Sequence, residues 1–198
     1  RDKETVSMGV EASLTGHLVF STLHTNSAPE SITRLLDMGM DPFNFADALL
    51  GILAQRLAKR LCDCKESYTP DADELKLFVA EYAEDLRHTK EWKADYAGEA
   101  KKLYEGWVNT YGEGGRLSFY RPVGCDKCNK TGYKGRIGLH ELLIADDDVK
   151  KLIQERARVA DLFVAAVGGG MRTLKMDGME KIMLGMTDIK QVRSVCIK

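Results

Sequence analysis

The sequence predicts a mixed α/β protein that carries a four-cysteine metal-binding module with a helical insert and ends in a mostly helical subdomain. Three observations lead to this fold class. A helix, an apolar strand and further helices alternate over residues 1–61, two close cysteine pairs fall within residues 62–136, and helical periodicity dominates residues 137–198. We take these three ranges as the expected domains.

The first range is expected to form an α/β unit. Residues 1–14 place apolar side chains at four-residue spacing, which is typical of a helix. The continuous apolar run Leu18–Phe20 predicts a strand buried on both faces of a mainly parallel sheet. A helix stopped by Gly39 should follow, and a further helix should run over residues 42–57, where apolar residues again recur at every fourth position.

The two cysteine pairs carry the strongest chemical signal in the chain. One residue separates Cys62 from Cys64, two separate Cys125 from Cys128, and glycines follow the second pair. Two such turns supply the four sulfur ligands that structural zinc prefers. The short first pair strains chelation by both thiols, and a disulfide or free buried cysteines are the alternatives, but we favour zinc. We expect Cys196 to behave as a small apolar residue.

The segment between the pairs predicts a helical insert over about residues 71–118. Two stripes of aromatic and aliphatic side chains indicate a helical hairpin with a break near His88-Thr89. We expect the aromatic side chains to form a small core. The insert is net acidic and residues 119–136 are net basic. Most such charge is a solvated face, and packing of the insert on this basic segment stays open.

The last range is expected to be helical after one strand over residues 137–144. The acidic run Asp146–Asp148 suits a helix N-terminus, and a second helix should precede Gly168–Gly170. Two more helices should follow, with a break at residues 185–187. Methionines at helical spacing favour core packing over a deformable partner surface.

Composition limits the possible partners. The net charge of −1 gives no global attraction to nucleic acid or to a membrane. No apolar run approaches the roughly 20 residues that cross a bilayer. We therefore expect a soluble chain whose membrane role, if it has one, comes through partners.

The order of several motifs resembles the C-terminal half of a secretion ATPase of the GspE/PilB class, which powers type II secretion or type IV pilus assembly. Residues 1–5 resemble the tail of that family's Walker B segment, and residues 15–26 resemble its histidine box. Residues 34–39, 54–57 and 170–174 fit the helices that follow and the C-terminal end. The resemblance covers nearly the whole chain outside the insert.

The resemblance implies the C-terminal portion of a RecA-like P-loop ATPase domain. It also implies a homo-hexameric parent that binds ATP and Mg²⁺ and carries a structural zinc. Its expected partners are inner-membrane platform and assembly proteins, and no nucleic acid is expected. The parent would lie in the cytoplasm, peripheral to the inner membrane through those partners.

The resemblance also assigns site residues. It implies catalytic roles for His24, His17 and Glu4, and nucleotide-binding roles for His24, Arg1 and Asp2. His17 and His24 are seven positions apart, so on a regular strand they point to opposite faces and do not readily share a metal. From the residues alone, a hydrogen-bonded core histidine is the alternative for both. With the resemblance we favour His24 as a sensor of the γ-phosphate.

The chain departs from a complete ATPase sequence. It contains no GxxxxGK[ST] loop, and Gly168–Gly170 cannot substitute because Met171 follows instead of a lysine that reaches phosphates. The Walker B carboxylates would lie before Arg1. We therefore expect a fragment that does not hydrolyse ATP alone.

The alternative function is a stand-alone zinc-knuckle module that binds a protein or a nucleic acid. The basic side chains around the second cysteine pair would then face the partner. The first 61 residues distinguish the two functions. A zinc knuckle that only binds a partner does not require the α/β unit that they are expected to form, whereas the ATPase does. The basic side chains are Arg121, Lys127, Lys130, Lys134 and Arg136.

Overall fold

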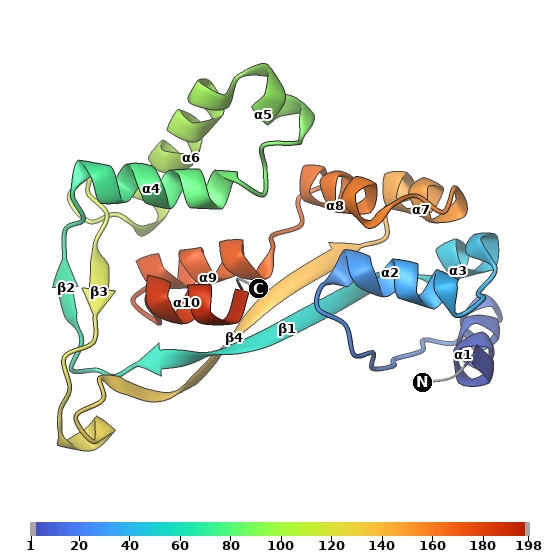
Figure 1. Cartoon of the computed structure of the whole chain (residues 1–198), viewed down its shortest axis with the longest axis horizontal. Coiled ribbons are helices and arrows are strands. Elements are labelled where there is room, and N and C mark those ends of the chain that lie inside the picture. The colour runs from blue at the N-terminus through green and yellow to red at the C-terminus, as the bar shows by residue number, and fades with distance from the viewer. Residues whose placement is uncertain (1–2, 197–198) are drawn as a thin grey trace. The chain divides into compact units, whose positions relative to one another are not determined.

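The computed structural model describes residues 3–196 as a mixture of helices and antiparallel strand pairs (Figure 1). The mixed α/β class is therefore confirmed in its coarse form. In chain order the elements are α1 (Lys3–Leu14), α2 (Ala28–Asp37), α3 (Pro42–Ala48), β1 (Gly51–Leu61), β2 (Glu66–Tyr68), α4 (Ala72–Ala83), α5 (Lys90–Ala94), α6 (Tyr96–Tyr111), β3 (Phe119–Arg121), the 3₁₀ helix η1 (Asp126–Cys128), β4 (Tyr133–Ile144), α7 (Asp147–Gln154), α8 (Val159–Gly168), α9 (Leu174–Met183) and α10 (Ile189–Cys196).

The strands form two separate pairs. The long strands β1 and β4 run antiparallel, since Cys62 N–H donates to Gly132 O (2.9 Å) at one end and Ala145 N–H donates to Leu50 O (3.0 Å) at the other. The short strands β2 and β3 pair antiparallel with Ser67 opposite Tyr120. Within residues 3–196 no two strands pair in parallel, so the parallel sheet expected around residues 18–20 is not found.

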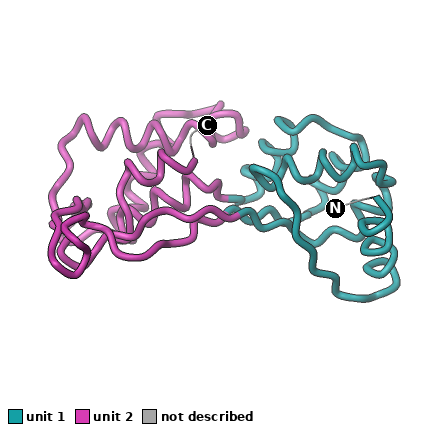
Figure 2. Tube along the Cα trace, turned by 60° about the horizontal axis from the view of Figure 1, so that its bottom comes forward, with its two compact units in different colours: residues 1–54, 141–171 teal, residues 55–140, 172–198 magenta. Residues whose placement is uncertain are grey.

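The chain folds as two compact units (Figure 2). Unit 1 contains the residues up to Ala54 together with Glu141–Met171, and unit 2 contains Gln55–His140 together with the residues from Arg172 onward. Over the described residues, no helix combines the length and the apolar character that crossing a bilayer requires.

Unit 1 is a cluster of short helices. Helix α3 contacts α1 and α7, and α8 contacts α2 and α7. Their apolar faces bury Ile32, Val149, Ile153 and Leu162 completely. The helices begin where the sequence supplies a capping side chain: Ser27, Asp41 and Asp146 accept from the backbone N–H groups of Glu30, Asn44 and Val149.

The core of unit 2 is built largely by the insert. Phe78 of α4 and Trp107 of α6 meet edge to face, with ring centroids 5.5 Å apart, and Phe78 also packs on Phe119 of β3 at 4.7 Å. Met179 and Ile182 of α9 complete this core. The expectation of a small aromatic core is confirmed, and so is that of core methionines for Met179 and Met183, whereas Met186 is exposed.

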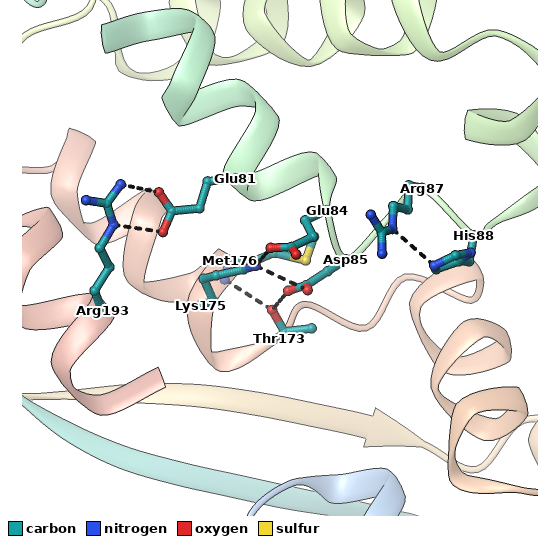
Figure 3. Close-up of polar contacts among 9 residues, drawn as sticks. All are labelled: Glu81, Glu84, Asp85, Arg87, His88, Thr173, Lys175, Met176 and Arg193. Carbon is teal, nitrogen blue, oxygen red and sulfur yellow. Dashed lines mark hydrogen bonds and ion pairs between the residues drawn. The ribbon is translucent and has the colours of Figure 1, made fainter. Parts of the chain in front are cut away.

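Charged side chains fasten the insert to α9 and α10 (Figure 3). Thr173, 6% exposed, donates its hydroxyl to Asp85 Oδ2 at 2.6 Å, and it also caps α9 by accepting from Met176 N–H at 3.2 Å. Acidic side chains of the insert therefore pair with cations of α9 and α10. The ion pairs are Glu84–Lys175 (3.0 Å), Asp85–Lys175 (3.3 Å) and Glu81–Arg193 (2.6 Å).

The buried strand expected at Leu18–Phe20 is wrong. The segment has no regular secondary structure and pairs with no described strand, and Leu18 and Phe20 are 68% and 87% exposed. A strand needs a neighbour to take up its N–H and C=O groups, and residues 3–196 place none beside it. The apolar run therefore lies on the surface of unit 1.

The helix expected over residues 42–57 is also wrong in its second half. Helix α3 ends at Ala48, and residues 51–61 form β1. Leu49, Leu53 and Leu57 are four positions apart, and an even spacing also places residues on one face of a strand. Gly51 permits the close approach of β1 to β4, because a Cβ there would lie 2.8 Å from Leu143 O.

The remaining helices follow the sequence pattern closely. Helix α4 ends at Ala83 and α5 begins after Thr89, which confirms the break near His88-Thr89. Helix α8 ends at Gly168, and α10 begins after Asp188 as expected. The strand expected from Ile137 begins slightly earlier, at Tyr133.

Candidate metal centre

The cysteines lie where the ends of β1 and β4 meet. Cys62 follows the last residue of β1, and its N–H group binds Gly132 O just before β4 begins (2.9 Å). Lys65 N–H donates to Cys62 O (3.0 Å), which closes the turn that carries Cys64. Cys125 precedes η1 and Cys128 ends it. Strand pairing therefore brings the two cysteine pairs together across the whole length of the insert.

Left-handed backbone shapes the second turn. Gly124 and Gly132 have φ values of +110° and +79°, and Asn129 and Lys130 are also left-handed. A Cβ would lie 2.6 Å from Lys130 O at Gly124, and 2.4 Å from the Pro122 side chain at Gly132. Both positions therefore require glycine.

The sulfur positions match a tetrahedral zinc site. The Sγ–Sγ distances are 3.9 Å for Cys62–Cys125, 3.9 Å for Cys64–Cys128 and 3.8 Å for Cys125–Cys128, and all four atoms lie within 4.8 Å of one another. A tetrahedron with Zn–S bonds of about 2.3 Å has edges of about 3.8 Å. The residues therefore fit zinc, and the short first pair does not keep either sulfur out of the cluster.

Backbone amides set the charge of this cluster. Cys125 N–H (3.1 Å) and Gly132 N–H (3.2 Å) donate to Cys128 Sγ, and these bonds lower the pKa of Cys128 to about 6. A hydrogen bond from the Gly124 backbone lowers the pKa of Cys64. Desolvation by burial and hydrogen bonds with the neighbouring thiols outweigh this effect and raise that pKa to about 11. At neutral pH, Cys128 is therefore mostly a thiolate, the form that binds metal.

Four protein sulfurs would leave no open coordination position, which is the pattern of a structural site rather than a catalytic one. A bound zinc would tie the end of β1 to the start of β4. The fifth cysteine, Cys196, lies outside the cluster and packs partly buried against Ala58, Leu139 and Leu174. None of the five cysteines forms a disulfide, so the disulfide alternative is not what the structure contains.

The other site residues expected from the sequence lie in unit 1 or outside the described residues. Glu4, His17 and His24 are exposed, so neither histidine is a core residue. Because residues 17–24 form no strand, the expectation that the two imidazoles point to opposite faces of one is wrong. Arg1 and Asp2 lie outside the described residues. The roles of these five residues stay predictions.

The segment around the two histidines is nevertheless held in place. His17 Nδ1 lies 3.3 Å from Thr15 Oγ1 and 3.2 Å from Ala12 O, at the end of α1. Arg34 of α2 donates from Nη1 to His24 O at 2.8 Å. The His24 backbone is thus anchored although the residue as a whole is exposed.

Sequence reasoning missed one buried polar residue, Glu141. Glu141 is 4% exposed, and its Oε1 accepts from Ala28 N–H at 2.8 Å. The signal was available, because alternation along β4 places Glu141 on the same face as Leu139 and Leu143. An acid on the buried face of an apolar strand is uncommon and needs a donor.

Comparison with known proteins gives a consistent result. A family described as "Type II/IV secretion system protein" matches residues 1–194. The chain is 40% identical to the type II secretion system ATPase E of Vibrio cholerae, over 98% of this chain and 33% of that protein. It is 38% identical to the type IV pilus assembly ATPase PilB of Thermus thermophilus (97% and 18%) and to the type II secretion system protein E of Dickeya dadantii (97% and 32%). The chain thus spans a third or less of these relatives.

Proposed function

Because the chain belongs to the Type II/IV secretion system protein family, we propose that it is the C-terminal part of an ATPase motor that powers type II protein secretion or type IV pilus assembly. It would complete a RecA-like P-loop domain, with ATP and Mg²⁺ held mainly by a phosphate loop that this sequence does not contain. The observation that carries the proposal is the family match over residues 1–194, which includes both the histidine segment and the cysteine module. An isolated zinc knuckle would not need the first of these.

Within this motor, His24 would report the γ-phosphate. Its exposed imidazole is accessible to a ligand, and the bond from Arg34 to its carbonyl fixes the backbone that carries it. His17 and Glu4 would act beside it, and Arg1 and Asp2 would lie near the nucleotide. Catalysis would then consist of positioning and charge stabilisation of phosphoryl transfer.

The cysteine module would act as a rigid arm. Its sulfur geometry supports a structural metal, and a metal can fix loops that lack a large core of their own. The motor would be a homo-hexamer at the cytoplasmic face of the inner membrane, and the arm would contact platform or assembly proteins there. Deletion of residues 62–136 from the motor should abolish secretion or pilus assembly, and normal export without them would refute this role of the arm.

A chimera tests the proposal. The aligned third of the Vibrio cholerae ATPase E is replaced by this chain, and ATP hydrolysis and secretion are measured. We expect the chimera to hydrolyse ATP, the 198-residue chain alone to be inactive, and His24→Ala to lower kcat at least tenfold. His88→Ala is the matched control, because His88 is also exposed but lies in the insert. A folded chimera without hydrolysis would refute the proposal.

A further inference from the structure

Glu141 joins β4 to the beginning of α2. The carboxylate is almost fully buried beside the end of β4, where Leu143 is completely buried, and it accepts the N–H group of Ala28 at 2.8 Å. The two residues are 113 positions apart in the sequence. Burial of a carboxylate costs free energy unless hydrogen bonds compensate it, so this contact holds the two elements in one relative position.

The contact lies at a helix N-terminus, where backbone N–H groups lack helical partners. Ala28 is the first residue of α2, and the preceding Ser27 side chain accepts from Glu30 N–H at 3.4 Å. Glu141 therefore takes one orphan donor of the first turn and Ser27 takes another. The negative charge also suits the positive end of the helix dipole.

The same turn of α2 holds the residues that follow His24. Thr25 Oγ1 lies 2.5 Å from Ser31 Oγ, and Asn26 N–H donates to Glu30 Oε2 at 3.2 Å. Together with the bond from Arg34 to His24 O, these contacts fix residues 24–27 to α2. Whatever orients α2 also orients the His24 backbone.

We infer that Glu141 is a positioning residue for His24, and this rests on the proposed role of His24. Loss of the carboxylate would free the first turn of α2 and leave a buried N–H group of Ala28 without its acceptor. His24 would then sample more orientations. As a positioning residue, Glu141 would not contact the nucleotide. Its loss should therefore lower kcat for ATP hydrolysis and leave KM for ATP nearly unchanged.

A double-mutant cycle in the chimera tests the inference. The variants are Glu141→Ala, His24→Ala and the pair. If Glu141 acts through His24, Glu141→Ala should lower kcat about tenfold with KM within about twofold, and it should add nothing in the His24→Ala background. Independent losses that multiply in the pair would overturn the inference, because a purely structural defect does not depend on His24.

Two further variants keep the test decisive if Glu141→Ala folds poorly. Glu141→Gln retains an acceptor oxygen of similar reach and should recover most of kcat. Arg34→Ala removes the bond to His24 O from an exposed position, so the fold is safe, and it should reproduce the fall in kcat. Wild-type kcat in Arg34→Ala, or no rescue by Glu141→Gln, would count against the inference.

Amide hydrogen exchange separates this inference from the proposed function. In the 198-residue chain, exchange at Ala28 should accelerate in Glu141→Ala and stay slow in Glu141→Gln, whether or not ATP is hydrolysed. Unchanged exchange at Ala28 would overturn the positioning contact itself. Wild-type kcat in the His24→Ala variant, by contrast, would refute the role of His24 in the proposed function. Glu141 would then have no catalytic histidine to position.

Discussion

Replacement of Cys128 by serine is expected to abolish metal binding and to loosen one local part of unit 2. Cys128 Sγ lies 3.8–3.9 Å from two other cysteine sulfurs, and backbone N–H donors lower its pKa to about 6. Serine offers neither the soft sulfur ligand nor the lowered pKa. Zinc content should therefore fall from about one per chain to near zero. Cys196→Ser is the matched control, because Cys196 lies outside the cluster.

The size of the stability change follows from linkage. At a free zinc concentration of about 100 times Kd, binding adds about 2.7 kcal/mol to the free energy of unfolding. A change of 1 kcal/mol shifts Tm by about 2–4 °C in a protein of this size, so Cys128→Ser should lower Tm by about 5–11 °C. The core around Phe78, Trp107 and Met179 contains none of the four cysteines, so it should survive the loss.

Elemental analysis, thermal unfolding and amide exchange check this expectation together. Exchange should accelerate at Lys130 and Thr131, whose N–H groups donate to the carbonyls of Cys125 and Cys128, and should stay slow in α9. Metal affinity should also fall more steeply below about pH 6, because Cys128 must then lose a proton in addition to Cys64. The reasoning fails if Cys128→Ser retains one zinc per chain, or if the wild-type chain binds none.

Three further predictions follow from single contacts. Gly132→Ala should destabilise the chain by more than about 1 kcal/mol and weaken zinc binding, since its Cβ would meet a proline side chain at 2.4 Å; Gly106→Ala in α6, where nothing lies within 4 Å, should not. Asp85→Ala should cost about 1.5–3 kcal/mol in urea denaturation, because it leaves the Thr173 hydroxyl without its charged acceptor; a cost near zero would show that the insert is not fastened there. Burial and a hydrogen-bonded aspartate raise the pKa of Tyr133 from 10.0 to about 12, so between those pH values the unfolded chain binds fewer protons and stability falls as pH rises. Tyr133→Phe should flatten that decline, and an identical slope in the variant would rule out the tyrosine as its source.

Much of the fold could be predicted from local signals. Capping aspartates, glycine breaks and apolar stripes placed the helices of the insert and of the last third, because each of these signals lies within the helix or directly beside its ends. The cysteine pairs could also be predicted, since metal ligands are chemically distinctive. The distances between their sulfurs then follow from β1 and β4 meeting at one end.

The failures have a common physical origin. Leu18–Phe20 has the composition of a buried strand, but burial requires a partner strand that residues 3–196 do not provide. The leucines of β1 recur every fourth position, which fits a helix and a strand equally. A few neighbouring residues in the sequence do not decide either case, because the outcome depends on tertiary partners. Glu141 was missed for a related reason, because its hydrogen-bond donor is the N–H group of Ala28, which lies 113 positions away in the sequence.

The short first cysteine pair shows how ligand geometry can come from tertiary structure. Its two sulfurs approach different partners, Cys62 toward Cys125 and Cys64 toward Cys128, so the two pairs interleave rather than chelate separately. A metal here would close a loop of about 60 residues, which is worth about 4 kcal/mol on the entropic estimate used for disulfides. Pairing of β2 with β3, which places Glu66 opposite Arg121, already closes nearly the same loop without the metal. Because part of that entropy is lost without the metal, zinc should stabilise the knuckle locally and the insert should hold the rest of unit 2.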